Sequence, residues 1–388
     1  MSKIKKVIIA LIAIFVLVAA ALGCYVWYST FDVSGLVFYD GEDIKEIYPY
    51  NDQIYVVTDN GAYVAGGYSA TQNRRYRNTE LYEDASLGIP SPVLFYQGKV
   101  TRVIPYGTLS ALFINDKNEL FAVDELEVTY LASDVVSADR YSRNGCVYAI
   151  DKDGRLLSVT EGKTTVIYSG VKAVKTYRER VFVILENGDL CEMFVNPDVG
   201  SATLGLPLFE NAREFDVVDT SLRYTGGKLV VDDETAIANP LFNVLDADGS
   251  LYVKGAYNLL QCGHQTLNGE IAEQPIKAFD SWTLISENVE AFGLSVMGTV
   301  MKFTDGSCAY YGFEVSEVTN TEFAFAALPA VESALSIHAT EGLICASTET
   351  EYYMWGGYFN VIFDNLTEEH YIFSGTPYVL PKYNGSKE

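Results

Sequence analysis

Two short acidic phrases contain the residue types that bind calcium. They are Asp151–Gly154 (DKDG) and Asp246–Gly249 (DADG). A calcium loop of the EF-hand kind needs oxygen ligands at positions 1, 3, 5 and 12, with glycine at position 6. Counted from Asp151, glycine already stands at position 4, and position 12 is Gly162. The spacing therefore favours hairpin turns, and we expect neither a metal nor another cofactor.

The sequence lacks the common catalytic signatures. Its three histidines, His264, His338 and His370, form no HExxH motif, and there is no GxSxG elbow or P-loop. Acidic residues abound, but nothing singles out a pair for glycoside hydrolysis. We therefore expect a protein that is not an enzyme. The alternative is a carbohydrate-active enzyme outside the cytoplasm, which would need carboxylates converging in a central channel or top cleft.

One dense basic segment stands in an acidic chain, at Asn73–Arg77 (NRRYR). Its guanidinium groups Arg74, Arg75 and Arg77 could clamp a carboxylate or phosphate, or stack on a sugar. Pairing with the neighbouring acids Glu80, Glu83 and Asp84 is the alternative. A second candidate binding set consists of aromatic residues beside glycines at the ends of repeated strands: Tyr68, Tyr257, Phe313, Trp355 and Tyr358. These could form a contact rim or pack between repeats.

A repeated pattern positions these residues. An apolar run leads into an Asp/Asn/Gly turn and then a second apolar run, which is the pattern of a β-hairpin with a type I′ turn. The copies are Ile54–Tyr68, Val147–Val159, Val181–Phe194, Asn243–Tyr257 and Val300–Phe313, with weaker ones at Ala111–Val123 and Ile344–Tyr358. They recur about every 48 residues, which predicts sheet blades around an axis.

The charge balance argues against nucleic acid as a partner. The chain has 27 basic and 51 acidic residues and a formal net charge of −24. Such a field repels phosphate backbones. Acidity of this kind fits a soluble body, or one that binds cations or basic partners.

The N-terminus predicts membrane attachment. Lys3, Lys5 and Lys6 precede Val7–Tyr28, which carries no charge and is long enough to span a bilayer as a helix. Basic residues stay in the cytoplasm, so the remaining chain should lie outside. Alternatives are a lipoprotein anchored at Cys24, which follows Ala21–Gly23, and simple secretion. The other cysteines, Cys146, Cys191, Cys262, Cys308 and Cys345, form no CxxC pair and are expected as small buried apolar residues.

The phrase Asp248–Gly263 (DGSLYVKGAYNLLQCG) resembles the repeat of the regulator of chromosome condensation family, and Asp59–Gly67 and Trp355–Gly357 are partial copies. The resemblance implies a seven-bladed β-propeller. The founding member is a nuclear exchange factor that binds a small GTPase and chromatin. An acidic, membrane-tethered chain departs from that, so only the scaffold carries over.

These observations predict an all-β, seven-bladed β-propeller preceded by one N-terminal transmembrane helix. Residues 1–28 would be a cytoplasmic basic stub and signal anchor, 29–43 a linker or closing strand, and 44–388 the propeller. A toroid must close its open sheet edge. Ser34–Tyr39, Tyr371–Phe373 and Tyr378–Leu380 are the candidate closing strands.

The predicted function is that of a binding module at the cell surface. Its partner would be a protein or glycan, with the membrane contacted through the N-terminal helix and no nucleic acid bound. Besides the carbohydrate-active enzyme, a structural subunit of a cell-surface complex is the alternative.

Overall fold

The structure is a computed structural model of the 388-residue chain. The residues that it describes all belong to the compact unit Phe38–Glu388. They are 44–50, 53–66, 93–107, 109–140, 145–160, 163–196, 200–218, 222–225, 228–231, 240–256, 266–267, 270–271, 278–295, 298–312, 326–328, 331, 334–339, 343–356 and 378–381.

The strands form seven antiparallel sheets of four strands each, here called blades 1 to 7 in chain order. Blades 1 to 4 contain β1 (Ile44–Tyr50), β2 (Gln53–Thr58), β3 (Gly61–Gly66) and β4 (Val93–Gln97); β5 (Val100–Gly107), β6 (Ser110–Asn115), β7 (Leu120–Asp124) and β8 (Glu127–Ala132); β9 (Val135–Arg140), β10 (Val147–Asp151), β11 (Arg155–Thr160) and β12 (Lys163–Ser169); and β13 (Val171–Tyr177), β14 (Arg180–Leu185), β15 (Leu190–Asn196) and β16 (Ser201–Phe209).

Blades 5 to 7 contain β17 (Ala212–Val218), β20 (Leu241–Asp246), β21 (Leu251–Ala256) and β24 (Ala278–Ser286); β25 (Val289–Leu294), β26 (Gly298–Phe303), β27 (Cys308–Gly312) and β28 (Ala326–Ala327); and β29 (Ser336–Ala339), β30 (Leu343–Ser347), β31 (Glu351–Gly356) and β32 (Tyr378–Pro381). Two hairpins are inserted in blade 5: β18 (Leu222–Thr225) with β19 (Lys228–Val231), and β22 (Thr266–Leu267) with β23 (Glu270–Ile271).

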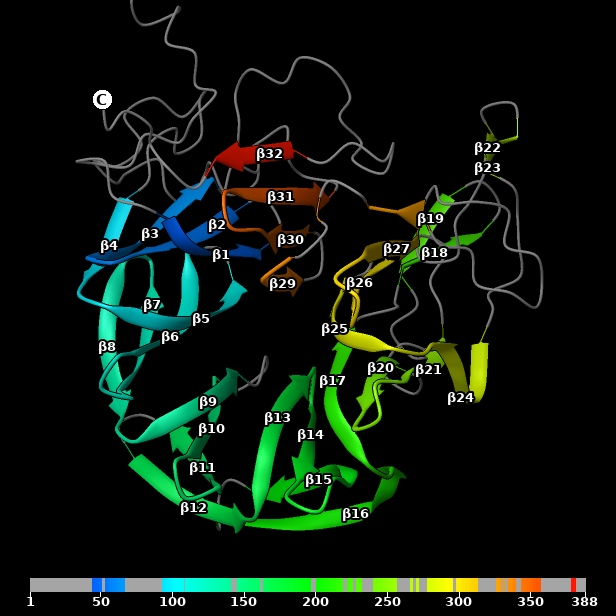
Figure 1. Ribbon diagram of the computed structural model, residues 1–388. Coiled ribbons are helices and arrows are strands. Elements are labelled where there is room, and N and C mark those ends of the chain that lie inside the picture. Colours follow the sequence, from blue (N-terminus) through cyan, green and yellow to red (C-terminus); the bar gives the residue numbers. More distant parts are fainter. Residues whose placement is uncertain are drawn as a thin grey trace, which may run out of the picture. The chain divides into compact units, whose positions relative to one another are not determined.

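The first strands of the blades close a ring. In the order β1, β5, β9, β13, β17, β25 and β29, each contacts the next, and β29 contacts β1. We call these seven the inner strands, and they surround the centre of the view in Figure 1. This arrangement confirms the predicted seven-bladed propeller. The predicted transmembrane segment Val7–Tyr28 lies outside the described residues. Within the described part of the chain, no helix is long and apolar enough to cross a membrane.

The hydrophobic core lies between neighbouring blades. The second strands β2, β6 and β20 are buried along their whole length because they have a strand on either side and a blade against each face. Between blades 1 and 2, Tyr55, Phe95 and Phe113 meet edge to face, with ring centroids 6.0 and 5.7 Å apart. Packing between blades thus needs apolar residues on both faces of the second strand, which explains the continuous apolar runs in the sequence.

The predicted hairpins are present, but their turn type differs from the prediction. A type I′ turn needs positive φ at both central residues, whereas in the loop Lys152–Gly154 only Gly154 has it, with φ of 71°. The Gly154 amide donates to the Asp151 carbonyl over 3.0 Å. This is a three-residue loop in which a type I turn is followed by a left-handed residue. Gly188, Gly249 and Gly306 repeat it, and Asn118 takes the same place in blade 2 with φ of 59°.

The C-terminal stretch supplies the outer strand of blade 7. Tyr378–Pro381 pairs antiparallel with β31, opposite Glu351–Met354. The candidate Tyr378–Leu380 therefore forms a strand, at the outer edge of blade 7 and paired with β31 of the same blade. The other two, Ser34–Tyr39 and Tyr371–Phe373, lie outside the described residues.

Candidate functional site

Most of the binding residues predicted from the sequence cannot be placed. Arg74, Arg75, Arg77, Tyr68, Tyr257, Phe313 and Tyr358 lie outside the described residues. Of the predicted set, only the backbone of Trp355 is described, in β31 opposite Ile344. Both predicted surfaces, the basic loop and the aromatic rim, therefore stay predictions.

The structure instead gathers charged side chains on the inner strands of blades 2 to 5. These are Arg102 on β5, Asp139 on β9, Lys175 on β13, and Glu214 and Asp216 on β17, which we call the inner-strand cluster. A break in register follows the first residue of β5, β13 and β17, as it does in β1 and β25. Such bulges re-aim side chains, and here the break precedes the charged positions.

Lys175 is the centre of the cluster. Its Nζ lies 3.3 Å from Asp216 Oδ1, across the boundary between blades 4 and 5, and the two side chains keep 38% and 22% of their surface exposed. The Asp216 carboxylate raises the pKa of Lys175; burial opposes this effect, and Asp139 adds to it. Lys175 is therefore held as a cation and remains within reach of solvent.

Asp139 joins blades 3 and 4. Its Oδ2 accepts the Thr176 amide over 2.7 Å, and its Oδ1 accepts the Arg140 amide over 2.8 Å. The Thr176 hydroxyl donates to the Arg140 carbonyl over 2.6 Å. Burial raises the pKa of Asp139, against the lowering effect of Lys175 and the two amides. The carboxyl group is thus fixed in place but costly to ionise.

Glu214 and Arg102 are the exposed members of the cluster. Although the residue keeps exposed surface, desolvation by the surrounding protein and the neighbouring Asp216 raise the pKa of Glu214, while Lys175 and Arg102 act in the opposite direction. At the boundary between blades 2 and 3, the Arg140 guanidinium lies over the ring of Tyr106, 3.8 Å from the ring centroid. Four blades therefore contribute cations and carboxylates to the inner-strand cluster.

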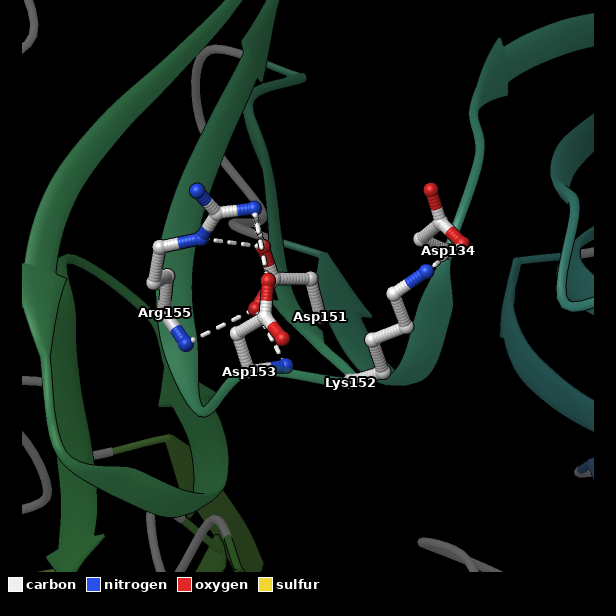
Figure 2. A network of polar contacts seen from close by, with 5 residues as sticks. All are labelled: Asp134, Asp151, Lys152, Asp153 and Arg155. Atoms are coloured by element: carbon white, nitrogen blue, oxygen red, sulfur yellow. Dashed lines mark hydrogen bonds and ion pairs between the residues drawn. The ribbon is translucent and has the colours of Figure 1, made fainter.

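The acidic hairpins form a different kind of network (Figure 2). Asp151 Oδ1 accepts the amides of Asp153 and Arg155, over 3.0 and 2.9 Å, and Oδ2 accepts the Arg155 guanidinium over 2.7 Å. Lys152 pairs with Asp134 over 2.8 Å. Asp246 holds its turn in the same way, through the amides of Asp248 and Ser250. Their oxygens are thus used by the turns themselves, which confirms the hairpin interpretation of these phrases.

A sequence signal for the inner-strand cluster does exist. Blades 2 to 5 begin with an apolar residue and have another three places later, with at least one polar or charged residue between them. Examples are Val171–Lys175 (VKAVK) and Ala212–Asp216 (AREFD). Predicting a site from these charges requires the knowledge that these strands line the ring.

Several solved structures are similar to this chain at low identity. The chain is similar to yeast RCC1 (Prp20) bound to Kap60, with 11% identity over 74% of this chain and 77% of that one and a TM-score of 0.46. It is also similar to Prp20p from Saccharomyces cerevisiae, with 10% identity over 92% of this chain and 88% of that one and a TM-score of 0.49. A third similar structure is human WBSCR16, with 12% identity over 89% of this chain and 83% of that one and a TM-score of 0.41.

No family model matches the sequence, and no curated protein matches it. The assignment of the blades rests on the strand order and contacts described above.

Proposed function

We propose that this protein is a binding module anchored in a membrane by Val7–Tyr28, with its propeller outside the cytoplasm. In this proposal the inner-strand cluster contacts a protein or a cell-surface ligand. The basic N-terminal residues and the uncharged segment after them support the orientation. The acidic body supports a partner other than nucleic acid.

The observation that carries the proposal is the convergence of Arg102, Asp139, Lys175, Glu214 and Asp216 from four blades. Ion pairs that keep a large exposed fraction add at most about 1 kcal/mol to stability, so the fold gains little from this arrangement. Groups whose pKa is shifted both by burial and by specific charged neighbours gather at functional sites. A partner with complementary charges would find its contacts prearranged here.

The test is capture of partners by the full-length protein in detergent, from solubilised envelope of the source organism, with mass spectrometry of what binds. The test variant is Lys175→Gln with Asp216→Asn, which removes one cation and one carboxylate from the cluster. The matched control is Lys152→Gln with Asp134→Asn, which removes the same charges from the exposed pair in Figure 2.

A specific partner should be recovered with the parent protein and the control, and at least several-fold less with the test variant. Equal recovery with all three proteins would contradict a role for the cluster. An Arg74/Arg75/Arg77→Ala variant in the same assay tests the basic loop predicted from the sequence.

The location needs its own experiment. In intact cells stripped of their wall, an added protease should cut the propeller but leave the Lys3–Lys6 end intact. Protection of the propeller until the membrane is dissolved would contradict the proposed orientation. Lipid labelling that disappears in a Cys24→Ser variant would identify the lipoprotein form instead.

A carbohydrate-active enzyme is the second candidate, because the structure does bring carboxylates together on the inner strands. Glycoside hydrolysis uses one protonated and one ionised carboxyl group, and the pKa values of Asp139 and Glu214 are both raised. Both oxygens of Asp139 are occupied by amides, so Glu214 would be the acid. Release of sugars from cell-surface glycans that is lost in Glu214→Gln would favour this function.

A further inference from the structure

Arg102 and Glu214 occupy equivalent positions on the inner strands of blades 2 and 5. Each is the first paired residue after the break in register. Arg102 lies opposite Ile114 and Glu214 opposite Leu245, and both of these partners stand one residue before the end of the second strand of their blade. Both side chains are exposed. We call this register position the first level of the ring.

Small side chains stand between Arg102 and Glu214 on the first level. At this position blade 3 has Ser137 and blade 4 has Ala173, and both are partly exposed. Neither side chain is long enough to bridge the guanidinium of blade 2 to the carboxyl group of blade 5. The first level therefore has opposite charges in two blades and short side chains in the two blades between them.

The charges two residues further along the inner strands already have partners. Lys175 and Asp216 form the ion pair described above, and both oxygens of Asp139 accept backbone amides. Side chains two residues apart on a strand point to the same side, so this second level lies next to the first. It is a fixed layer of charge whose hydrogen bonds are made within the protein.

Arg102 and Glu214 differ from the second level because they are not bonded. Neither side chain makes a hydrogen bond or an ion pair with any residue in the part of the chain that the structure describes. The charge of Arg102 nevertheless opposes the rise in the pKa of Glu214, of Tyr48 in blade 1 and of Lys175 in blade 4. A guanidinium from blade 2 that acts on groups in three other blades extends toward the ring centre.

We propose that the first level binds a zwitterion of the amino-acid type, with its carboxylate on Arg102 and its ammonium group on Glu214. A guanidinium offers a carboxylate two parallel N–H donors. A simple anion would gain Arg102 but face Glu214 and Asp216, and a simple cation would gain Glu214 but face Arg102 and Lys175. A ligand that carries both charges has a complementary group at each end. The inference rests on the proposed function, because it takes the inner-strand cluster as a binding site.

Isothermal titration calorimetry of the full-length protein in detergent tests the class of ligand. The probes are the common free amino acids, added one at a time, and two derivatives of any that binds. The N-acetyl derivative lacks the cation, and the amide lacks the carboxylate. We expect at least one amino acid to bind. Each derivative should bind at least about ten-fold more weakly, because a hydrogen bond to a charged group is lost.

Two variants remove the charges of the first level one at a time. Arg102→Gln and Glu214→Gln should each bind the same amino acid at least about ten-fold more weakly. The control is again Lys152→Gln with Asp134→Asn, which should bind it like the parent protein. Because both side chains are exposed, we expect both variants to fold, and circular dichroism verifies this.

The inference is overturned if no amino acid binds the parent protein, or if either folded variant binds it as tightly as the parent does. The capture experiment distinguishes this failure from a failure of the proposed function. A captured partner that depends on Lys175 and Asp216, together with no amino-acid binding, would overturn the zwitterion alone. Equal capture by all the proteins, together with no amino-acid binding, would contradict both proposals.

Discussion

The amide of Val171 donates a hydrogen bond to the carbonyl oxygen of Gly154 over 2.9 Å, and this bond crosses from blade 4 to blade 3. The same bond recurs from Ala212 to Gly188, from Val289 to Gly249 and from Val135 to Asn118, each at 2.8 Å. The turn that ends one hairpin thus also fixes the first strand of the next blade. One residue thus shapes the turn of its own hairpin and, through its carbonyl oxygen, holds the next blade of the ring in place.

Replacing Gly154 should reveal this double function. Its φ of 71° favours glycine, and an added Cβ would lie 3.1 Å from Glu186 Oε1 and 3.6 Å from the Val171 carbonyl oxygen. Because the left-handed conformation costs an L-residue about 1–2 kcal/mol, Gly154→Ala should lower the free energy of unfolding by about that amount. Denaturant unfolding of the two proteins measures the difference.

Asparagine provides the control for this substitution, since Asn118 occupies the same turn position in blade 2. Its side chain tolerates the left-handed region. Gly154→Asn should therefore cost clearly less than Gly154→Ala. If both cost the same, contact with Glu186 or Val171 rather than backbone strain would set the penalty.

The carboxylate of Asp151 should make the stability of blade 3 depend on pH. Burial opposes its ionisation, but the Arg155 amide and guanidinium and the Asp153 amide hold the pKa of Asp151 below its usual value. A carboxyl group whose pKa is lower in the folded than in the unfolded state stabilises the fold above the unfolded value. That contribution is lost as the pH falls through the folded value.

The variant Asp151→Asn isolates this charge. Asn115 holds the corresponding turn of blade 2 through the amides of Lys117 and Glu119, so the amide should keep the turn. We expect Asp151→Asn to cost about 1 kcal/mol at pH 7, and the parent and variant to converge in strongly acidic solution. If the difference in the free energy of unfolding between parent and variant stays constant with pH, the charge of Asp151 does not contribute to stability. Asp151→Ala, which also removes the acceptor, should cost about 1–3 kcal/mol.

The fold was predictable because each repeated hairpin is specified by residues that are close together in the sequence. The turn at Gly188 or Gly249 is specified by a few neighbouring residues, and seven such turns at regular spacing indicate a ring of blades. The turn type was wrong because Asp151 belongs to the strand, which leaves three loop residues instead of two. An Asp-Gly pair between two apolar runs occurs both in two-residue type I′ turns and in three-residue loops, so the sequence does not distinguish them.

The inner-strand cluster was not predictable in the same way. Arg102 and Asp216 are far apart in the sequence, and each stands in an opening phrase whose charges look like ordinary surface residues. Both act on the pKa of Lys175, and they do so only because the ring brings β5 and β17 to its centre. Glu46 on β1 and His338 on β29 are separated in the sequence by nearly the whole propeller. They lie 3.4 Å apart because blades 1 and 7 meet when the ring closes.

The buried thiols should be unreactive in the folded protein. Cys146, Cys191, Cys308 and Cys345 are buried, as expected of small apolar residues. Burial raises the pKa of Cys191 and of Cys308, and the thiolate is the reactive form. Alkylation followed by mass spectrometry should leave these four unmodified until denaturant is added. Rapid labelling of any of them under native conditions would contradict the packing described.

Removing β32 should destabilise blade 7. Its four residues Tyr378–Pro381 cover the edge of β31 opposite Glu351–Met354. Truncation before Tyr378 would leave that edge unpaired next to the buried Tyr352 and Met354. At about 1 kcal/mol for each backbone hydrogen bond lost, the free energy of unfolding should fall by about 2–4 kcal/mol. Truncation after Pro381 is the matched control, because it shortens the chain but keeps β32. Thermal unfolding of the parent and the two truncated proteins gives the comparison, and an equally stable protein without β32 would show that this strand does not support the ring.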